Sequence, residues 1–412
     1  MPSRVLIIGA GLAGHRAAVE LRKRDQHISI TLLGAEATLP YDRPPLTKDF
    51  LSGNCGQADL ILDQAADFSV LNIDYHSGTT VTEIDRTGKT IATSTGEKMA
   101  YDKLLLAMGS RNRTVEVAGD ASALHSIRDI ESAVQLRKAL KPGAKVIVIG
   151  GGFIGLEVAA VARTLGCDVT VVEAGPRLMA RAAPSQISAF VQGMHEAKGV
   201  RFIFNINIKS ITRSFDGRSI LQLADRAIGG DVLVAGIGIQ PNVELAQQAG
   251  LDVQNGIVVD RHCRTSDVDI FAAGEVTAHP SGRADQLRRV ESWRTASLQP
   301  LVAADCILGG AACFDDPPWF WSDQYDVNIQ SIGDPLGGTK LLRHPAPKGE
   351  GWTLIAVDEQ RQPVGAVSIN LGRDISRLRQ VITSQQELPE EMWEKSSPVL
   401  SEEPDFVEVN SE

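Results

Sequence analysis

The stretch Val5-Leu-Ile-Ile-Gly9-Ala-Gly11-Leu-Ala-Gly14 decides the fold of this chain, because it joins an apolar strand pattern to a glycine-rich turn and the start of a helix. The three glycines have separate tasks. One makes the tight turn, one lets the backbone approach a pyrophosphate, and one lets the helix pack closely on the strand. The free N–H groups and the dipole at the helix start then hold the phosphates. The stretch therefore predicts a dinucleotide-binding βαβ unit.

A second copy follows at Val146-Ile-Val-Ile-Gly150-Gly-Gly152-Phe-Ile-Gly155. A single G-x-G-x-x-G can be no more than a tight turn, whereas two copies that each follow a strand pattern indicate two dinucleotide sites. Two dinucleotides on one chain suggest a flavin enzyme that is supplied by a nicotinamide.

The size and composition of the chain fit this prediction. Its 412 residues allow two or three domains, and 43% hydrophobic with 22% charged residues is typical of a globular protein. The longest apolar run, Val146 to Leu156, is shorter than the roughly 20 residues of a membrane-spanning helix. The N-terminus leads directly into the first strand, so we expect no signal peptide, no membrane partner and a cytoplasmic enzyme.

The negative charge is concentrated at the C-terminus. The net charge is −10, and the segment from Glu387 to Glu412 contributes nine acidic residues and one lysine. Nucleic acid is therefore excluded as a partner. We predict that the acidic tail is solvated and partly disordered.

The five cysteines form no C-x-x-C pair and no metal-ligand spacing. They are predicted to be small buried hydrophobic residues, without a metal site. Their spacing also excludes the redox-active pair of a flavin disulfide reductase. They are Cys55, Cys167, Cys263, Cys306 and Cys313.

The first βαβ unit is predicted from a strand at 4–8, a helix at 12–24 and a strand at 28–33. An acid that binds ribose hydroxyls normally ends such a unit. Here Gly34 stands at the strand end and Glu36 follows slightly late, so Glu36 is either a ribose ligand or a solvated loop residue.

Pro44-Pro45 fixes a turn that can lead into a helix. The turn holds Arg43 and Lys48 near the carboxyl ends of the parallel strands. A cation there can stabilise negative charge on a reduced flavin or on phosphates, but either residue can equally be an ordinary surface charge.

The second βαβ unit is predicted from strands at 146–149 and 169–172 with a helix at 153–165 between them. Glu173 ends it, 21 residues after Gly152, where a carboxylate binds the ribose 2′-OH and repels a 2′-phosphate. Arg177 and Arg181 lie only in the following loop. The sequence therefore predicts NADH rather than NADPH.

The remaining candidates lie where the chain returns to the first domain and beyond it. Gly274 allows close backbone approach, and Glu275 offers a carboxylate to a ribityl or ribose hydroxyl, although it can equally be a plain loop residue. The aromatic run 318–324 is either core or a platform against a flavin ring. We predict an FAD domain at 1–110 and 241–313, an NAD domain at 111–240, and a C-terminal domain with the acidic tail at 314–412.

Several motifs in fixed order resemble the NADH-dependent ferredoxin reductases of bacterial Rieske-type aromatic-ring oxygenases. The most specific are P-Y-D-R-P-P-L-x-K at 40–48 and W-x-W-S-D-Q at 319–324; G-G-G-x-I-G-L-E at 150–157 and E-x-W-x-x-A at 291–296 accompany them. The resemblance runs from Val5 to about Arg379. It implies an α/β, glutathione-reductase-like architecture with two Rossmann-type dinucleotide-binding domains and a C-terminal α+β domain.

The resemblance also implies the chemistry. FAD would take a hydride from NADH at flavin N5 and give electrons singly to a 2Fe–2S ferredoxin that serves an oxygenase. Lys48 and Glu157 would form an ion pair beside N5, and Trp321 would pack near the flavin; these three are the catalytic candidates. The chain is expected to be a monomer or a weak homodimer.

The motifs and the resemblance together give two sets of binding residues. The FAD contacts are Gly9, Gly11, Leu12, Ala13, Gly14, Glu36, Arg43, Lys48, Ala107, Gly109, Arg128, Gly274, Glu275 and Trp293. The NAD contacts are Gly150, Gly152, Phe153, Ile154, Gly155, Glu157, Glu173, Arg181, Gly236, Ile237 and Gly238.

The chain departs from the family pattern in three places. Met108 replaces a threonine, Glu275 replaces an aspartate, and Pro300 replaces a glycine after Gln299. These departures put the local flavin contacts in doubt without removing the site.

Two other functions fit the same fold. An NADH oxidase or peroxidase needs a reactive cysteine near the flavin, for which Cys55 is the nearest candidate. A flavin-bound binding protein would respond to NADH only by a change of conformation or of oligomeric state. For the ferredoxin reductase, we expect a local basic patch to bind an acidic ferredoxin. Each candidate residue can equally be an ordinary solvated surface charge. The candidates are Arg288, Arg289, Arg373, Arg377 and Arg379.

Overall fold

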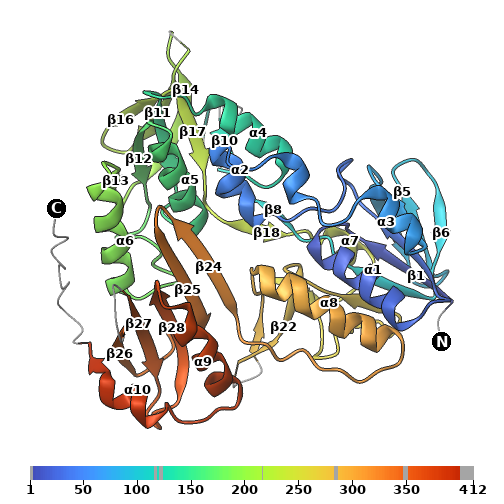
Figure 1. The fold of residues 1–412 in the computed structure, drawn as a ribbon. Helices are drawn as coiled ribbons and strands as arrows, with labels where there is room; N and C mark the ends of the chain where they lie inside the picture. Colours follow the sequence, from blue (N-terminus) through green and yellow to red (C-terminus); the bar gives the residue numbers. More distant parts are fainter. Residues whose placement is uncertain are drawn as a thin grey trace. The chain divides into compact units, whose positions relative to one another are not determined.

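The computed structural model of the protein describes residues 3–115, 118–119, 124–215, 217–282, 286–346 and 351–399. The part of the predicted acidic tail from position 400 onward lies outside these residues. The chain divides into two compact units (Figure 1). The first comprises Met1–Arg43, Gln57–Arg111 and Ile239–Pro318, and the second comprises Pro44–Gly56, Asn112–Gly238 and Trp319–Glu412. The division into three domains at the boundaries given above remains a prediction.

The first unit is built on a parallel five-stranded sheet in the order β21-β7-β1-β2-β3. Its strands are almost continuously buried, because both faces of the sheet are covered. The strands are β1 (Arg4–Ile8), β2 (Ser29–Leu33), β3 (Ile73–His76), β7 (Lys103–Leu106) and β21 (Ile270–Ala272).

One face of this sheet packs against two helices that lie side by side, α1 (Leu12–Arg24) and α8 (Trp293–Ile307), as Figure 1 shows. The other face packs against an antiparallel sheet of β4 (Val81–Asp85), β5 (Thr90–Thr93) and β6 (Lys98–Ala100). Ile84 and Ile91 of this small sheet contact the core residues Leu104 and Leu106. The parallel sheet is thus covered on both faces.

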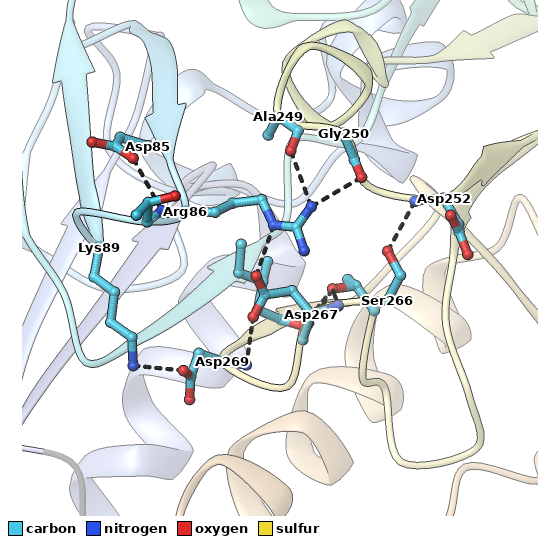
Figure 2. A network of polar contacts seen from close by, with 12 residues as sticks. Asp85, Arg86, Lys89, Ala249, Gly250, Asp252, Ser266, Asp267 and Asp269 are labelled. Atoms are coloured by element: carbon cyan, nitrogen blue, oxygen red, sulfur yellow. Dashed lines mark hydrogen bonds and ion pairs between the residues drawn. The ribbon is translucent and has the colours of Figure 1, made fainter.

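A polar network fixes the loop that enters β21 (Figure 2). Arg86, directly after β4, donates from Nε to Asp267 over 2.7 Å and from Nη1 to the carbonyl of Gly250 over 3.0 Å. Asp269 accepts from Lys103 at 2.6 Å and lies 2.5 Å from Lys89, and these two ammonium groups lower the pKa of its carboxyl. The network therefore holds β21 in place, and Gly274 follows at the other end of this strand.

The second unit contains the other parallel sheet, in the order β10-β17-β11-β12-β13. Beside it lies an antiparallel group of β14, β15 and β16, in which β14 also pairs with β9. The bounds are β10 (Leu124–His125), β11 (Lys145–Ile149), β12 (Asp168–Val172), β13 (Arg201–Ile203), β17 (Val232–Ala235), β9 (Ala118–Gly119), β14 (Ile208–Arg213), β15 (Ser219–Leu223), β16 (Ala227–Gly230), α4 (Ile130–Ala139), α5 (Phe153–Thr164) and α6 (Ser185–Ala197).

A six-stranded antiparallel sheet completes the second unit, in the order β24-β25-β28-β27-β26-β29. One face shares a hydrophobic core with α5 and α6, in which Leu156 and Ile187 pack together with Leu354 and Val367. The other face packs against α9 and α10. The bounds are β24 (Trp319–Gln324), β25 (Val327–Gly333), β26 (Lys340–Pro345), β27 (Trp352–Val357), β28 (Pro363–Ile369), β29 (Ser397–Pro398), α9 (Gly372–Thr383) and α10 (Glu390–Lys395).

Short elements connect these layers. They are η1 (Pro44–Thr47), α2 (Asp49–Ser52), η2 (Gln57–Leu60), α3 (Ala65–Val70), β8 (Ser110–Asn112), β18 (Ile239–Pro241), α7 (Glu244–Gln248), β19 (Val253–Gln254), β20 (Gly256–Val258), β22 (Thr277–Ser281) and β23 (Gln286–Arg288). No helix of the described residues combines the length and the apolar character that crossing a bilayer requires.

The prediction for the cysteines was partly wrong. Cys167, Cys263 and Cys306 are buried, but Cys55 is half-buried and Cys313 is exposed. The burial of Cys313 was mispredicted because this residue lies in the loop after α8. Burial in a loop depends on how the chain turns back, and it produces no periodic pattern in the sequence.

Candidate functional site

The first glycine loop connects β1 to α1. Gly9 has φ +107°, and a side chain there would overlap the carbonyl of Ala107; a side chain on Gly14 would overlap the carbonyl of Gly9. Gly11 differs, because none of the described residues, apart from its immediate neighbours in the chain and helix, has an atom within 4 Å of its Cβ position. Two of the three glycines are thus required by packing. The third borders open space at the helix N-terminus, the kind of position at which glycine-rich loops of this type hold a pyrophosphate.

The second loop, between β11 and α5, repeats this arrangement. Gly150 has φ +106° and a side chain there would overlap the carbonyl of Gly236; a side chain on Gly155 would overlap the carbonyl of Gly150. Around Gly152 the described residues again leave the Cβ position open to a distance of 4 Å. Gly236 directly follows β17 beside this loop, and its N–H donates to the carbonyl of Ile149 over 2.8 Å.

Glu173 reaches the second glycine loop from the end of β12. Its Oε2 accepts from Gly151 N–H at 2.7 Å and its Oε1 accepts from Gly175 N–H at 2.7 Å. The carboxylate is therefore fixed beside the phosphate loop. The guanidinium of Arg177 donates hydrogen bonds to Ala183 O at 2.8 Å and to Ser188 Oγ at 2.7 Å, so it is engaged within the protein. Arg181, by contrast, is exposed.

Glu36 lies in a different environment from Glu173. Its carboxylate accepts from Arg43 Nη2 at 2.6 Å and from Tyr41 Oη at 2.7 Å. The guanidinium of Arg43 also lies 5.0 Å from the centre of the Tyr41 ring. Glu36 is thus neither a free loop charge nor directly at the strand end, and it holds Arg43 in place.

The carboxyl ends of β1, β7 and β21 meet at one edge of the first sheet, which brings Gly9, Ala107 and Gly274 together. Gly274, with φ +87°, donates its N–H to Gln299 Oε1 at 2.8 Å. Gln299 is fully buried, and its Nε2 has no hydrogen-bond acceptor among the described residues. A buried donor without a protein acceptor beside this loop fits a bound group that carries oxygen atoms.

Other predicted contacts in the first unit have partners of their own. Trp293 donates from Nε1 to Asp42 at 2.7 Å, and burial raises the pKa of Asp42. Gly109, with φ +60°, accepts from Asn242 N–H at 3.0 Å, and the Asn242 side chain donates to Met108 O at 2.8 Å. The Met108 substitution therefore leaves the backbone of this segment well fixed.

The second unit contains a buried ion pair. Glu157 on α5 is 2% exposed, and Lys48, which directly precedes α2, places Nζ 2.8 Å from its Oε1. Ser322 on β24 donates to the same oxygen over 2.6 Å, and Thr47 donates to Oε2. The ammonium of Lys48 also lies 5.8 Å from the centre of the Trp321 ring. The lysine is thus held between a carboxylate and an indole.

Two further buried residues extend this cluster. Gln324 donates from Nε2 to Ser322 Oγ at 3.0 Å, and its Oε1 lies 2.8 Å from His195 Nε2. Burial lowers the pKa of His195, so its neutral form donates from Nε2 to the amide oxygen. The donors thus form a chain that runs from His195 through Gln324 and Ser322 to Glu157, the partner of Lys48 in the ion pair.

The predicted residues divide between the two units. Most of the FAD set lies in the first unit, whereas Lys48 and Arg128 belong to the second, as does the whole NAD set. Thr47 and Ser322 were not predicted from the sequence. Ser322 belongs to the specific W-x-W-S-D-Q motif, and this membership was a signal that the polar side chain makes a functional contact.

Comparison with known proteins covers both units. A family model described as pyridine nucleotide-disulphide oxidoreductase matches residues 3–299, and one described as reductase C-terminal matches residues 319–400. These matches confirm the predicted α/β fold class with Rossmann-type domains and an added C-terminal domain.

Individual relatives match over nearly the whole chain. The ferredoxin–NAD(+) reductase component of the anthranilate 1,2-dioxygenase system of Burkholderia cepacia is 42% identical over 92% of this chain and 94% of its own. The covalent putidaredoxin reductase–putidaredoxin complex is similar with a TM-score of 0.89 at 31% identity, covering 93% of both chains. The ferredoxin reductase for the CYP199A2 system from Rhodopseudomonas palustris gives a TM-score of 0.89 at 34% identity, covering 94% of this chain and 96% of its own.

Proposed function

We propose FAD as the group that links the two half-reactions of this chain, which belongs to the pyridine nucleotide-disulphide oxidoreductase family and, within it, to the ferredoxin–NAD(+) reductases. Bound FAD would accept the hydride of NADH at N5 and release two electrons one at a time to a 2Fe–2S ferredoxin that serves an oxygenase. The protein's own task is to bind both dinucleotides, orient them, and fix the charges around them.

The open space beside Gly11 is the observation that carries the proposal for FAD. Gly9 and Gly14 are required for packing, but no residue in the described part of the chain approaches position 11 closely enough to require a glycine there. Its extended backbone, with φ −73°, would accept alanine without strain. A glycine there is explained by a pyrophosphate that lies against the backbone at the start of α1. Leu12 and Ala13 begin this helix, and Gly274 with Glu275 adjoins it.

Gly152 and Glu173 support NADH as the second dinucleotide in the same way. Gly152 has φ −85° and open space at its Cβ position. The fixed carboxylate of Glu173 would accept from ribose hydroxyls and oppose a 2′-phosphate. Phe153 and Ile154 start α5 at this loop, and Gly236 to Gly238 adjoin it.

Lys48, Glu157 and Trp321 are proposed to act together where the nicotinamide meets the flavin. Glu157 neutralises Lys48, and Ser322 and Thr47 fix the orientation of its carboxylate. Lys48 can then place a single well-oriented positive group near the reacting rings without leaving a net buried charge. Trp321 would shield this group from water.

The glycine pairs give a direct experiment. Gly11→Ala should fold normally but bind FAD at least about tenfold more weakly, while Gly152→Ala should keep its FAD and raise the KM for NADH. Gly14→Ala and Gly155→Ala are the matched controls, because both should fail by destabilising the fold. The measurements are flavin absorbance after dialysis, thermal unfolding, and anaerobic reduction by one equivalent of NADH followed by addition of oxidised 2Fe–2S ferredoxin.

The outcomes separate the parts of the proposal. Loss of flavin from a folded Gly11→Ala protein while Gly152→Ala keeps its flavin, with rapid ferredoxin bleaching by the wild type, would support it. A Gly11→Ala protein that retains FAD as tightly as the wild type would contradict the pyrophosphate site. A wild-type flavin that stays reduced in the presence of several ferredoxins would contradict the electron transfer. A cytoplasmic location and a monomer or weak homodimer remain part of the proposal, and sedimentation tests the latter.

A further inference from the structure

Two cysteines and a histidine meet in the first unit, where α8 ends and the chain turns back. Cys306 belongs to the last turn of α8, Cys313 follows in the next loop, and His262 lies in the loop after β20. The Sγ atoms of Cys306 and Cys313 lie 3.9 Å and 3.7 Å from the same atom, Nδ1 of His262. The two thiols therefore share one neighbour, the imidazole of His262.

The loop between the cysteines is held in a defined conformation. The backbone N–H groups of Gly310 and Ala312 donate to the carbonyl and the carboxylate of Asp305, each over 2.9 Å. The Cys306 thiol donates to the carbonyl of Ala312 at 3.3 Å, and Ala312 directly precedes Cys313. The thiol of Cys306 thus already lies against the backbone that carries Cys313.

His262 offers a base to the exposed thiol. Its Nδ1 lies 2.8 Å from the Ala312 carbonyl oxygen, which can only accept, so Nδ1 carries the proton and Nε2 has a free lone pair. This Nε2 lies 4.0 Å from the Sγ of Cys313. Because the thiolate is the nucleophilic form of cysteine, a nearby proton acceptor favours reaction at Cys313.

The buried cysteines are poorly suited to react first. Burial raises the pKa of the Cys306 thiol and raises that of Cys263 well above its ordinary value. Cys263 is fully buried and its thiol faces the carbonyl of Gln299 at 3.6 Å. Within the described part of the chain no three His, Cys, Asp or Glu side chains are arranged to hold a metal ion, so the cluster is not explained by metal binding.

We propose that Cys313 is a peroxide-reactive thiol and that Cys306 is its resolving partner, which makes the loop after α8 a site of reversible oxidation. This assignment rests on the exposure of Cys313, the shared contact with His262 and the position of the Cys306 thiol, and it is independent of FAD and of the electron-transfer function.

The chemistry balances with hydrogen peroxide as the oxidant. Nε2 of His262 takes the proton of the Cys313 thiol, and the thiolate attacks one peroxide oxygen, so an S–O bond forms and the O–O bond breaks; the departing hydroxide takes that proton back from Nε2 and leaves as water. The Cys306 sulfur then attacks the sulfenic acid sulfur. An S–S bond forms, the S–O bond breaks, and the hydroxide leaves with the Cys306 proton as a second water. A dithiol reductant reverses the oxidation.

Mass spectrometry of the full-length flavin-loaded protein tests this proposal. The protein is reduced, freed of reductant, treated briefly with equimolar to tenfold hydrogen peroxide, alkylated and digested with trypsin. No lysine or arginine lies between Thr295 and Thr339, so both cysteines remain in one peptide. The expected product is this peptide with two hydrogen atoms fewer and no alkyl group on either cysteine, and dithiothreitol should restore both alkylation sites.

Variants identify the role of each residue. Cys306→Ser should trap the sulfenic acid of Cys313, detectable with dimedone, and Cys313→Ser should abolish the two-hydrogen loss. His262→Asn should slow the reaction of Cys313 several-fold. Cys55 is the internal comparison, because it is half-buried and in the other unit, and Cys313 should react at least about tenfold faster.

Two results would overturn the proposal. One is equal reactivity of Cys55 and Cys313, which would mean that the surroundings of Cys313 have no effect. The other is overoxidation of Cys313 in the wild type while Cys306 remains alkylated, which would show that Cys306 does not resolve. Circular dichroism of each variant establishes that it is folded, so that no change in its reactivity can be attributed to a folding defect.

Discussion

Replacing Glu157 by glutamine tests the buried ion pair that lies at the centre of the proposed mechanism. The glutamine has the same shape and its Oε1 can still accept from Ser322. The glutamine Nε2 takes the place of the Glu157 oxygen that accepts from Thr47. The Thr47 hydroxyl can then donate to the carbonyl of Pro44, which lies 3.4 Å away. The substitution therefore removes the negative charge and little else, and the Lys48 ammonium loses its counter-charge.

The magnitude follows from the burial of the two partners. The side chains of Lys48 and Glu157 are 16% and 3% exposed, so water cannot replace the lost carboxylate. Removal of one partner of a buried pair costs about 3–5 kcal/mol. Because Lys48 keeps some exposure, we expect the lower end, about 3 kcal/mol of unfolding free energy, or more than a hundredfold in the unfolding equilibrium.

The assay is equilibrium unfolding in urea at saturating FAD, followed by tryptophan fluorescence. Trp319, Trp321, Trp352 and Trp393 all belong to the second unit, so the signal reports mainly on the unit that holds the pair. Lys48→Met and the double variant complete a cycle, from which we expect a coupling free energy of about 2 kcal/mol.

A coupling below about 0.5 kcal/mol would refute the reasoning, since that value is typical of exposed pairs. Ser322→Ala serves as a reference. It should cost about 1.5–3 kcal/mol through a lost hydrogen bond to a charged group, without removing the charge of Lys48.

Three further predictions follow from the same contacts. Glu173→Gln should lower the ratio of kcat/KM for NADH over NADPH by about tenfold, since a lost charge-assisted hydrogen bond costs about 1.5–3 kcal/mol; an unchanged ratio would mean that another residue reads the ribose. Burial lowers the pKa of His279, which is 2% exposed, from 6.5 to about 4. Its contribution to stability is therefore complete above pH 6.5 and is lost as the pH falls toward 4. Between pH 7 and 4 the wild type should lose about 3 kcal/mol more unfolding free energy than His279→Gln, and equal losses would contradict the burial argument. Arg373→Glu with Arg377→Glu, two exposed positions on α9, should lower ferredoxin reduction and leave NADH–ferricyanide activity unchanged, whereas equal loss of both activities would remove this face as the docking surface.

The parts of the fold that follow local rules were predictable from the sequence. The glycine loops and the strands β1, β2, β11 and β12 lie within one residue of their predicted bounds, because strand burial and glycine backbone geometry depend on neighbouring residues. The family resemblance, confirmed by the comparisons, also indicated the Lys48–Glu157 pair, which the structure contains.

The remainder of the site depends on contacts between distant segments. Thr47 and Ser322 meet Glu157 across 110 and 165 residues of sequence, and no local pattern encodes such a contact. The helix α4 was missed although Asp129 and Ser132 form a capping box, a signal that could have been used. By contrast, α6 begins after Pro184 without a side-chain cap, so its start had no capping signal in the sequence.

The hydrophobic core shared by α5, α6 and the six-stranded sheet limits how this reductase can be re-engineered. A chimera that took only its C-terminal sheet from a related enzyme, in order to change the choice of ferredoxin, would set foreign side chains against Leu156 and Ile187. Such a graft should misfold or lose cooperativity unless the matching faces of α5 and α6 are transplanted with it. The exchangeable module is therefore the whole second unit, so the proposed docking face on α9 and the proposed NADH site would be transferred together.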